Sequence, residues 1–127
     1  MRARELVSDV PFTRESIYEL PRPAASVDTV VCLEVLEHLG DPEAGLRELA
    51  RVTQRHVILS VPREPLWRLL NMARGAYLRD WGNTPGHLSH WSRKGFLRWA
   101  STVFDVVAVR CPIPWTIVLA KKRDARE

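Results

Sequence analysis

Two short apolar segments with an amphipathic segment between them are the feature that most constrains how this chain folds. Residues 27–33 and 56–61 are too short for buried helices and rich in β-branched side chains, which is typical of strands buried on both faces. Between them, leucine and valine recur at helical spacing over residues 42–53, after an Asp41-Pro42 pair that can cap a helix and form its first turn. Strand, helix and strand in this order predict a βαβ unit, and therefore a parallel sheet.

The middle of the chain predicts two more helices around a long loop. Apolar residues recur at helical spacing over residues 65–77, and this pattern ends at the turn-forming residues 81–86. Ser92 is a suitable N-cap for a further helix over residues 93–101. We therefore expect a helical and loop insertion at about residues 64–91.

The end of the chain predicts a hairpin. Residues 103–111 and 115–120 both have the apolar, β-branched composition of strands, and the residues between them are too few for the crossover that a parallel pair needs. We therefore expect one α/β domain over residues 1–127, with a parallel sheet, helices and a C-terminal antiparallel hairpin.

Composition limits the classes of function. The chain has 127 residues, 46% of them hydrophobic, which is enough for one core and too little for two ordinary domains. The net charge is only +4, and we interpret the bases at residues 2–4 and 121–123 as solvated, so no clear nucleic-acid partner is indicated. The sequence has neither a membrane-spanning segment nor the apolar start of a secretory signal, so we expect a cytoplasmic protein with free, buried thiols at Cys32 and Cys111.

Two carboxylates and an imidazole follow the first apolar strand. Glu34, Glu37 and His38 would share one face if the strand ran directly into a helix, at the strand end where open α/β folds place their ligands. Carboxylates suit Mg²⁺ or Mn²⁺, and an imidazole shifts the preference toward Mn²⁺ or Zn²⁺. His87, in the loop of residues 82–91, is available as a fourth ligand. The alternative is that Glu37 and His38 simply begin a helix and face solvent or a hydrogen-bond partner.

Histidines also provide the candidate catalytic groups. We take His38 and His90 as candidates for moving a proton, and His90 is also an alternative metal ligand. The alternative for His90, which lies just before the cap of a helix, is a loop hydrogen bond.

The segment between the second strand and the last helix is rich in tryptophan and arginine. Residues 64–91 contain four aromatic residues and three arginines, namely Trp67, Tyr77, Trp81, Trp91, Arg68, Arg74 and Arg79. This composition suits a lid over a substrate that is a sugar, a phenol or an anion. The alternative is a packed helix with a solvated basic face.

The order and spacing of several segments resemble class I S-adenosylmethionine (SAM) dependent methyltransferases, from about Glu15 to Arg123. The matching segments are Glu-Ser-Ile-Tyr-Glu-Leu-Pro at residues 15–21, Val-Asp-Thr-Val-Val-Cys-Leu-Glu-Val-Leu-Glu-His-Leu at residues 27–39, the helix and strand that follow, and the closing hairpin. The resemblance implies a partial Rossmann-like methyltransferase sheet and SAM as cofactor.

The resemblance also implies which residues would lie against SAM. By position, Ser16 and Ile17 would lie near its adenine, and Cys32, Leu33 and Glu34 would border its methionine end. Ser16 departs from the family, which commonly has an aspartate there that accepts from the adenine amino group.

The pattern Glu-x-x-Glu-His with a downstream histidine is similar to that of metal-dependent O-methyltransferases, namely the small-RNA 2′-O-methyltransferases and the ubiquinone-pathway O-methyltransferases. In those enzymes the metal binds substrate hydroxyls. Carried over residue by residue, the resemblance implies Glu34, Glu37, His38 and His87 as metal ligands. It implies methyl transfer to an oxygen, and we expect a small-molecule acceptor.

The main departure from the family is the absence of its Gly-rich SAM loop. All six glycines, from Gly40 to Gly95, lie beyond the point where that loop belongs. Either the chain is N-terminally shortened, or another chain supplies the missing half. The sequence therefore leaves two functions open: a methyltransferase, or a non-catalytic remnant that acts as a binding or interaction module. In both cases we expect a homo-oligomer or a partner chain over the exposed half.

Overall fold

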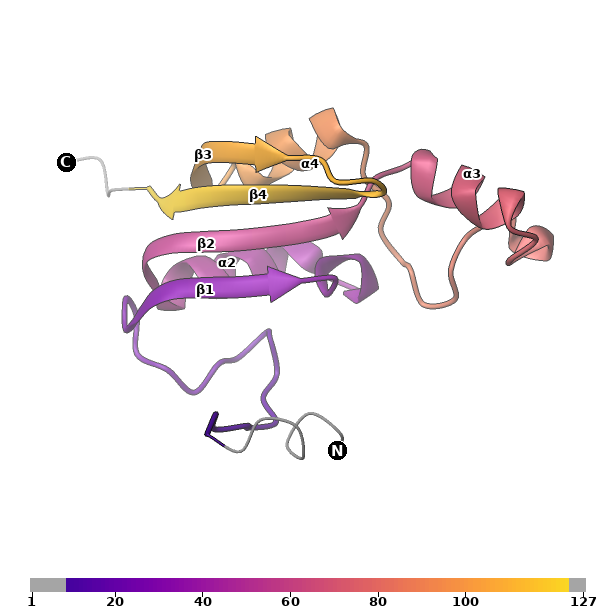
Figure 1. The fold of residues 1–127 in the computed structure, drawn as a ribbon. Helices are drawn as coiled ribbons and strands as arrows, with labels where there is room; N and C mark the ends of the chain where they lie inside the picture. Colours follow the sequence, from indigo (N-terminus) through magenta and orange to yellow (C-terminus); the bar gives the residue numbers. More distant parts are fainter. Residues whose placement is uncertain (1–8, 124–127) are drawn as a thin grey trace.

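In the computed structural model, residues 9–123 are described, and they form one mixed α/β fold around a four-stranded sheet (Figure 1). The strands are β1 (Val27–Leu33), β2 (Thr53–Pro62), β3 (Phe104–Arg110) and β4 (Trp115–Lys122). The helices are α2 (Pro42–Val52), α3 (Leu66–Ala73) and α4 (Arg93–Ala100), with short 3-10 turns η1 (Leu36–His38) and η2 (Leu78–Asp80). None of the helices in this part of the chain is long and apolar enough to cross a membrane.

The sheet has the predicted mixture of strand directions. Its strand order is β1-β2-β4-β3, with β1 parallel to β2 and with β4 antiparallel to both of its neighbours. The crossover helix α2 allows the parallel pair, and the short β3–β4 connection forces the antiparallel one. The expected α/β class with a C-terminal hairpin is confirmed.

Local capping explains where the helices begin and end. The Asp41 carboxylate accepts a hydrogen bond from the Ala44 amide at 2.9 Å, and the Ser92 hydroxyl accepts one from the Gly95 amide at 3.1 Å. The helix α3 is shorter than the predicted 65–77, because Gly75 adopts the left-handed conformation with φ of 73° and the chain turns there.

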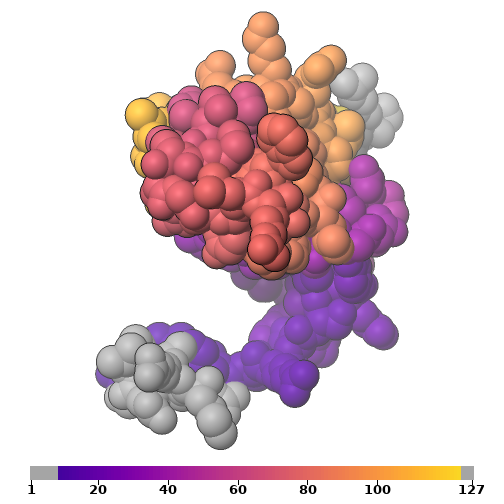
Figure 2. Space-filling model, turned by 90° about the vertical axis from the view of Figure 1, so that its right-hand side faces the viewer, coloured from indigo at the N-terminus to yellow at the C-terminus, as the bar shows by residue number. Residues whose placement is uncertain are grey.

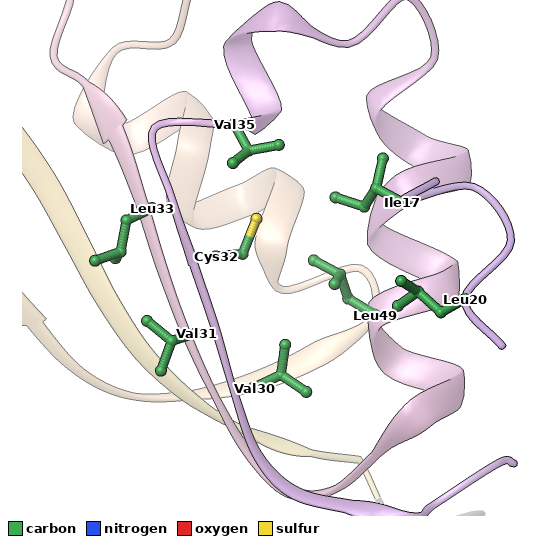
Figure 3. A pocket seen from close by; sticks show the side chains of 8 residues that line it. All are labelled: Ile17, Leu20, Val30, Val31, Cys32, Leu33, Val35 and Leu49. Carbon is green, nitrogen blue, oxygen red and sulfur yellow. The ribbon is translucent and has the colours of Figure 1, made fainter. Parts of the chain in front are cut away.

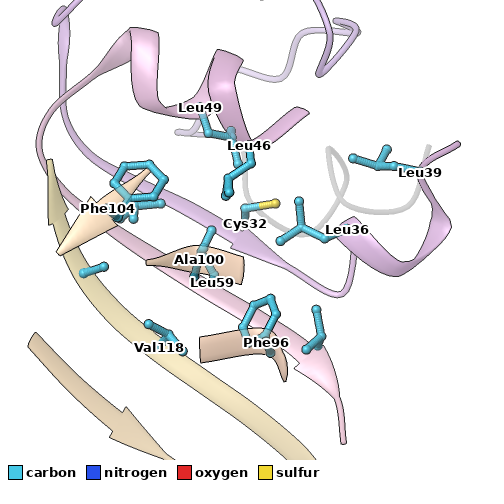
Figure 4. Close-up of a cluster of buried hydrophobic side chains, with 13 residues drawn as sticks. Cys32, Leu36, Leu39, Leu46, Leu49, Leu59, Phe96, Ala100, Phe104 and Val118 are labelled. Atoms are coloured by element: carbon cyan, nitrogen blue, oxygen red, sulfur yellow. The ribbon is translucent and has the colours of Figure 1, made fainter. Parts of the chain in front are cut away.

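The core lies between one face of the sheet and the two helices α2 and α4. Figure 4 shows apolar side chains from all of these elements meeting in one cluster. Its largest fully buried hydrophobic side chains are Phe96, Phe104, Leu36, Leu46 and Leu59. Alternate β2 residues contribute to it, as a strand that packs one face requires.

The opposite face of the sheet is apolar and open. Val31 and Leu33 on the edge strand β1 are 59% and 49% exposed. Val31 lies in register with Ile58, and Ile58 with Leu119, so an apolar row crosses three strands. Within the described residues neither α2 nor α4 covers this face, and β1 has no strand on its outer side.

The basic C-terminal residues are less solvated than the sequence suggests. Lys122 Nζ donates to the Thr53 carbonyl at 2.9 Å, and Arg123 pairs with Asp105 at 3.1 Å. The corresponding interpretation of residues 2–4 lies outside the described part of the chain.

Candidate functional site

The segment after β1 does not run directly into a helix. Glu34 adopts the left-handed conformation with φ of 54°, and only the 3-10 turn η1 follows. The expected helical face shared by Glu34, Glu37 and His38 is therefore wrong, because the left-handed residue breaks the helical register before it starts.

Glu34 is held by two residues from distant parts of the chain. Its carboxylate oxygens accept hydrogen bonds from Ser60 Oγ at 2.7 Å and from Trp115 Nε1 at 3.0 Å. Neither partner has a signal in the local sequence, since the two are 26 and 81 residues away from Glu34. Glu34 is not among the side chains whose donor atoms lie close enough together to hold one metal ion.

Three of the four predicted ligands do converge. One donor atom each from Glu37, His38 and His87 lies within 4.8 Å of the other two. Glu37 Oε1 is 3.8 Å from His38 Nε2, and the two imidazole rings meet edge to face with centroids 4.8 Å apart. The four-ligand prediction is thus reduced to a cluster of three.

Backbone hydrogen bonds bring the His87 loop to η1. The amides of Leu88 and Ser89 both donate to the Glu37 carbonyl, at 2.7 and 3.1 Å. His38 Nδ1 is 2.8 Å from the Gly86 carbonyl oxygen. A carbonyl oxygen only accepts, so Nδ1 carries the hydrogen and Nε2 of His38 carries a lone pair directed away from that bond.

Glu37 is a buried carboxyl group without a hydrogen-bond partner. Glu37 is 1% exposed, and neither of its carboxylate oxygens has a hydrogen-bond partner among the described residues. Burial is the main reason why its pKa rises to about 7, and nearby Glu34 raises it further. The polar backbone N–H of Glu37 itself and the charge of His38 lower this pKa in turn. An unsatisfied buried carboxyl group of this kind is costly and is typical of a functional site.

The surroundings of His87 favour its neutral imidazole form. Burial lowers the pKa of His87, and the charges of His38 and His90 lower it further. A neutral imidazole near pH 7 keeps the lone pair that a metal ligand needs.

His90 lies beside this cluster but outside it. Its Nδ1 is 3.5 Å from Oε1 of Glu64, a side chain that is only 10% exposed. The structure therefore pairs His90 with a carboxylate that sequence reasoning did not single out, rather than with Glu37. As an alternative metal ligand, His90 is not supported by this placement.

An apolar groove follows the open side of β1, with a volume of about 510 Å³. In Figure 3, Val30 and Cys32 point toward α2, whereas Val31 and Leu33 point to the other face of the sheet. The full lining is Ile17, Leu20, Val30, Val31, Cys32, Leu33, Val35 and Leu49. Three of the five predicted cofactor-binding residues therefore line this groove, namely Ile17, Cys32 and, from the other side of β1, Leu33.

The other two predicted cofactor residues lie elsewhere. The Ser16 hydroxyl accepts from the Tyr18 amide at 3.3 Å, which closes a local turn, and the Glu34 carboxylate faces Ser60 and Trp115. Neither side chain lines the groove.

Both cysteines are free, as expected, but only Cys32 is buried. Burial, and then the charge of Glu37, raise the pKa of Cys32 to about 11, so its thiol stays neutral and unreactive. Cys111 is half-buried, which corrects the expectation that both thiols lie in the core.

Residues 1–61 match a family described as a methyltransferase domain. A probable S-adenosylmethionine-dependent methyltransferase of Mycobacterium tuberculosis is 44% identical over 52 residues, which cover 41% of this chain and 19% of that protein. The matched segment is thus about a fifth of that relative's length.

Solved structures share the fold over nearly the whole chain. A SAM-dependent methyltransferase from Aquifex aeolicus aligns with a TM-score of 0.69 and 16% identity, over 96% of this chain and 60% of the other. Magnesium protoporphyrin IX methyltransferase from Synechocystis, with S-adenosylhomocysteine bound, aligns with a TM-score of 0.64 and 20% identity, over 96% and 57%. These neighbours are longer, and at this identity they establish the fold alone.

Proposed function

We propose that this chain, a member of the SAM-dependent methyltransferase family, provides the acceptor side of a site that methylates an oxygen of a small molecule. The observation that supports this most is the buried, unpartnered Glu37 carboxyl group beside His38 and His87. The cluster follows β1 in the chain, and Cys32 and Leu33, which line the apolar groove, are the last two residues of that strand.

The three clustered side chains fit a divalent metal ion. One carboxylate and two imidazoles suit Mn²⁺ or Zn²⁺ better than Mg²⁺. Ligand atoms of a tetrahedral ion at about 2.1 Å each are ~3.4 Å apart, so the donor atoms of Glu37, His38 and His87, which lie within 4.8 Å of one another, would draw closer on binding. The hydrogen bond from His38 Nδ1 to a backbone carbonyl is also the usual support of a ligating histidine.

A bound divalent ion would polarise an acceptor hydroxyl and lower its pKa. The side chains Glu37, His38 and His87 would hold the ion, while Glu34 stays fixed by Ser60 and Trp115. Loss of Mn²⁺ binding in Glu37→Gln and in His87→Ala, but not in the exposed control Glu19→Gln, is the direct test of this assignment.

We assign to His90 the role of the general base that takes up the proton of the acceptor hydroxyl. His90 Nδ1 faces Glu64 at 3.5 Å, which orients the ring and leaves Nε2 free to accept a proton. When bound, SAM would supply the methyl group from its sulfonium, and His90 would take up the proton of the acceptor hydroxyl as its oxygen is methylated. His38, which also was a candidate base, is better used as a ligand because its Nε2 faces Glu37.

The isolated chain should bind SAM weakly, with a Kd well above the low micromolar range. Only the apolar groove with Ile17, Cys32 and Leu33 is present, and the sequence has no Gly-rich cradle to let the backbone approach the ligand. Isothermal titration of SAM into the chain measures this. A Kd of about 1 μM, or ~8 kcal/mol, would show that another segment replaces the cradle.

The open sheet favours a second role, in which the chain binds a protein. We expect self-association through β1 and the exposed Val31 and Leu33, because an unpaired edge and an apolar face are both available. Sedimentation should show a concentration-dependent dimer that Val31→Lys abolishes. Val107→Lys, at an equally exposed position on the far edge strand β3, should leave it intact. A monomer at every concentration contradicts this role.

A further inference from the structure

A second groove, of about 350 Å³, lies between α3 and the start of β4. Figure 1 shows α3 beyond the end of β2 and the start of β4, and Figure 2 looks at this end of the molecule, where α3 and the loop after it face the viewer. The groove is lined by Trp67, Leu70, Asn71, Arg74, Pro114 and Trp115. Most of these residues belong to the segment that we propose as an insertion, residues 64–91.

The aromatic walls of this groove contact the candidate site. The Trp67 ring stacks on the His87 ring, with centroids 6.0 Å apart and an angle of 26° between the planes. Trp115 lies against Trp67, with a centroid distance of 6.2 Å, and its indole nitrogen donates to Glu34. A molecule in the groove would therefore lie next to the Glu37, His38 and His87 cluster.

The polar groups of the groove are largely used within the protein. Trp67 Nε1 donates to Thr84 Oγ1 at 2.9 Å, Trp115 Nε1 donates to Glu34, and Asn71 Nδ2 donates to the Gly82 carbonyl at 2.8 Å. The parts of the indole rings that His87 and the neighbouring indole do not cover, and the apolar side chains, remain for a ligand. Such a surface suits a flat ring and not a sugar, which needs several hydrogen-bond partners.

Arg74 gives the groove a positive charge. Among residues 9–123 its guanidinium has no ion pair and no side-chain hydrogen bond, whereas the neighbouring Arg68 donates to the Trp81 carbonyl. No carboxylate lines the groove. An arginine without an ion-pair partner in a groove lined by two indoles suits a carboxylate, which it can bind through two parallel hydrogen bonds.

We infer that this groove binds a planar aromatic carboxylate, with the ring against Trp67 and Trp115 and the carboxylate on Arg74. That the bound molecule is the methyl acceptor rests on the function proposed above. The binding itself does not, since it needs neither SAM nor a metal ion.

The test is isothermal titration of the full chain, with chelator present and SAM absent, using 2-naphthoate and its neutral analogue 2-naphthamide. Naphthoate should bind about tenfold tighter than the amide, because only the anion pairs with Arg74. Arg74→Gln should remove this preference and leave amide binding unchanged. Arg79→Gln, which changes an exposed arginine outside the groove, should keep it.

A second variant and a second probe distinguish the contribution of the aromatic ring to the affinity from that of the carboxylate charge. Leu70→Asp, at a half-exposed position of the lining, should weaken naphthoate by more than tenfold and the amide by less. Cyclohexanecarboxylate should bind more weakly than naphthoate, since it lacks the flat ring.

The outcomes distinguish this inference from the proposed function. Naphthoate binding that depends on Arg74 supports the groove even if Mn²⁺ does not bind to the cluster. Binding that is unaffected by Arg74→Gln, or the absence of any naphthoate binding, overturns the groove assignment. Mn²⁺ binding at Glu37 and His87 would still stand in that case.

Discussion

Glu37→Gln should stabilise the metal-free chain by about 3 kcal/mol near pH 8 and by much less near pH 4.5, relative to the unchanged protein. The reason is that burial raises the pKa of Glu37 from its ordinary 4.5 to about 7. The folded chain therefore binds more protons than the unfolded chain between these two pH values. The contribution of Glu37 to the free energy of unfolding is therefore fully present below pH 4.5 and is lost as pH rises through about 7. Glutamine has a similar shape and carries no charge to bury.

Urea unfolding of both proteins across this pH range, with chelator present, measures the difference. Comparing the two proteins cancels the opposite contribution of His87, whose lowered pKa makes stability fall as pH drops below the ordinary histidine range. Glu48→Gln is the matched control. Hydrogen bonds from Arg51 and the Leu20 amide lower the pKa of Glu48 to about 2, so its effect should be constant between pH 5 and 8. A pH-independent effect of Glu37→Gln would contradict the buried state of this carboxyl group.

The strands could be predicted from the sequence because their signal is local. A run of β-branched residues fixes β1 to the same bounds in the sequence and in the structure. The strand β2 begins at Thr53, three residues before its apolar run, because parallel pairing with Val27 extends it over polar residues. The end of α3 depends on the left-handed Gly75, and the helical pattern of apolar residues continues past that glycine.

The candidate site was only half predictable, because its geometry depends on contacts between distant residues. The sequence suggested Glu37, His38 and His87, and the loop hydrogen bonds to the Glu37 carbonyl bring them together. The sequence also suggests Glu34, because a helix directly after β1 would place it on the same face and because the family resemblance includes it. The left-handed conformation of Glu34 and its bonds to Ser60 and Trp115 follow from the tertiary fold. The pairing of His90 with Glu64 likewise has no signature in the local sequence.

A divalent metal ion should raise the melting temperature of the unchanged chain by about 10 °C at a hundredfold excess over its Kd, which corresponds to ~2.7 kcal/mol. The ion binds the folded cluster of Glu37, His38 and His87 and hardly binds the unfolded chain. At equal metal concentrations the rise should be larger with Mn²⁺ or Zn²⁺ than with Mg²⁺, because two of the three donors are imidazoles and the Kd is therefore lower. It should fade as pH falls below about 7, where Glu37 takes up the proton that the ion must displace.

Variants of single histidines decide which side chains hold the ion. His87→Ala should abolish the rise, measured against the melting curve of the same variant in chelator, so that any loss of intrinsic stability cancels. His90→Ala should keep most of it, because His90 pairs with Glu64 outside the cluster. Equal losses in both variants would place the ion between the two histidines instead. Identical curves of the unchanged chain in chelator and in excess metal would remove the metal from the proposed function. The buried Glu37 would then have to be explained as a neutral acid, which the pH series on Glu37→Gln measures independently.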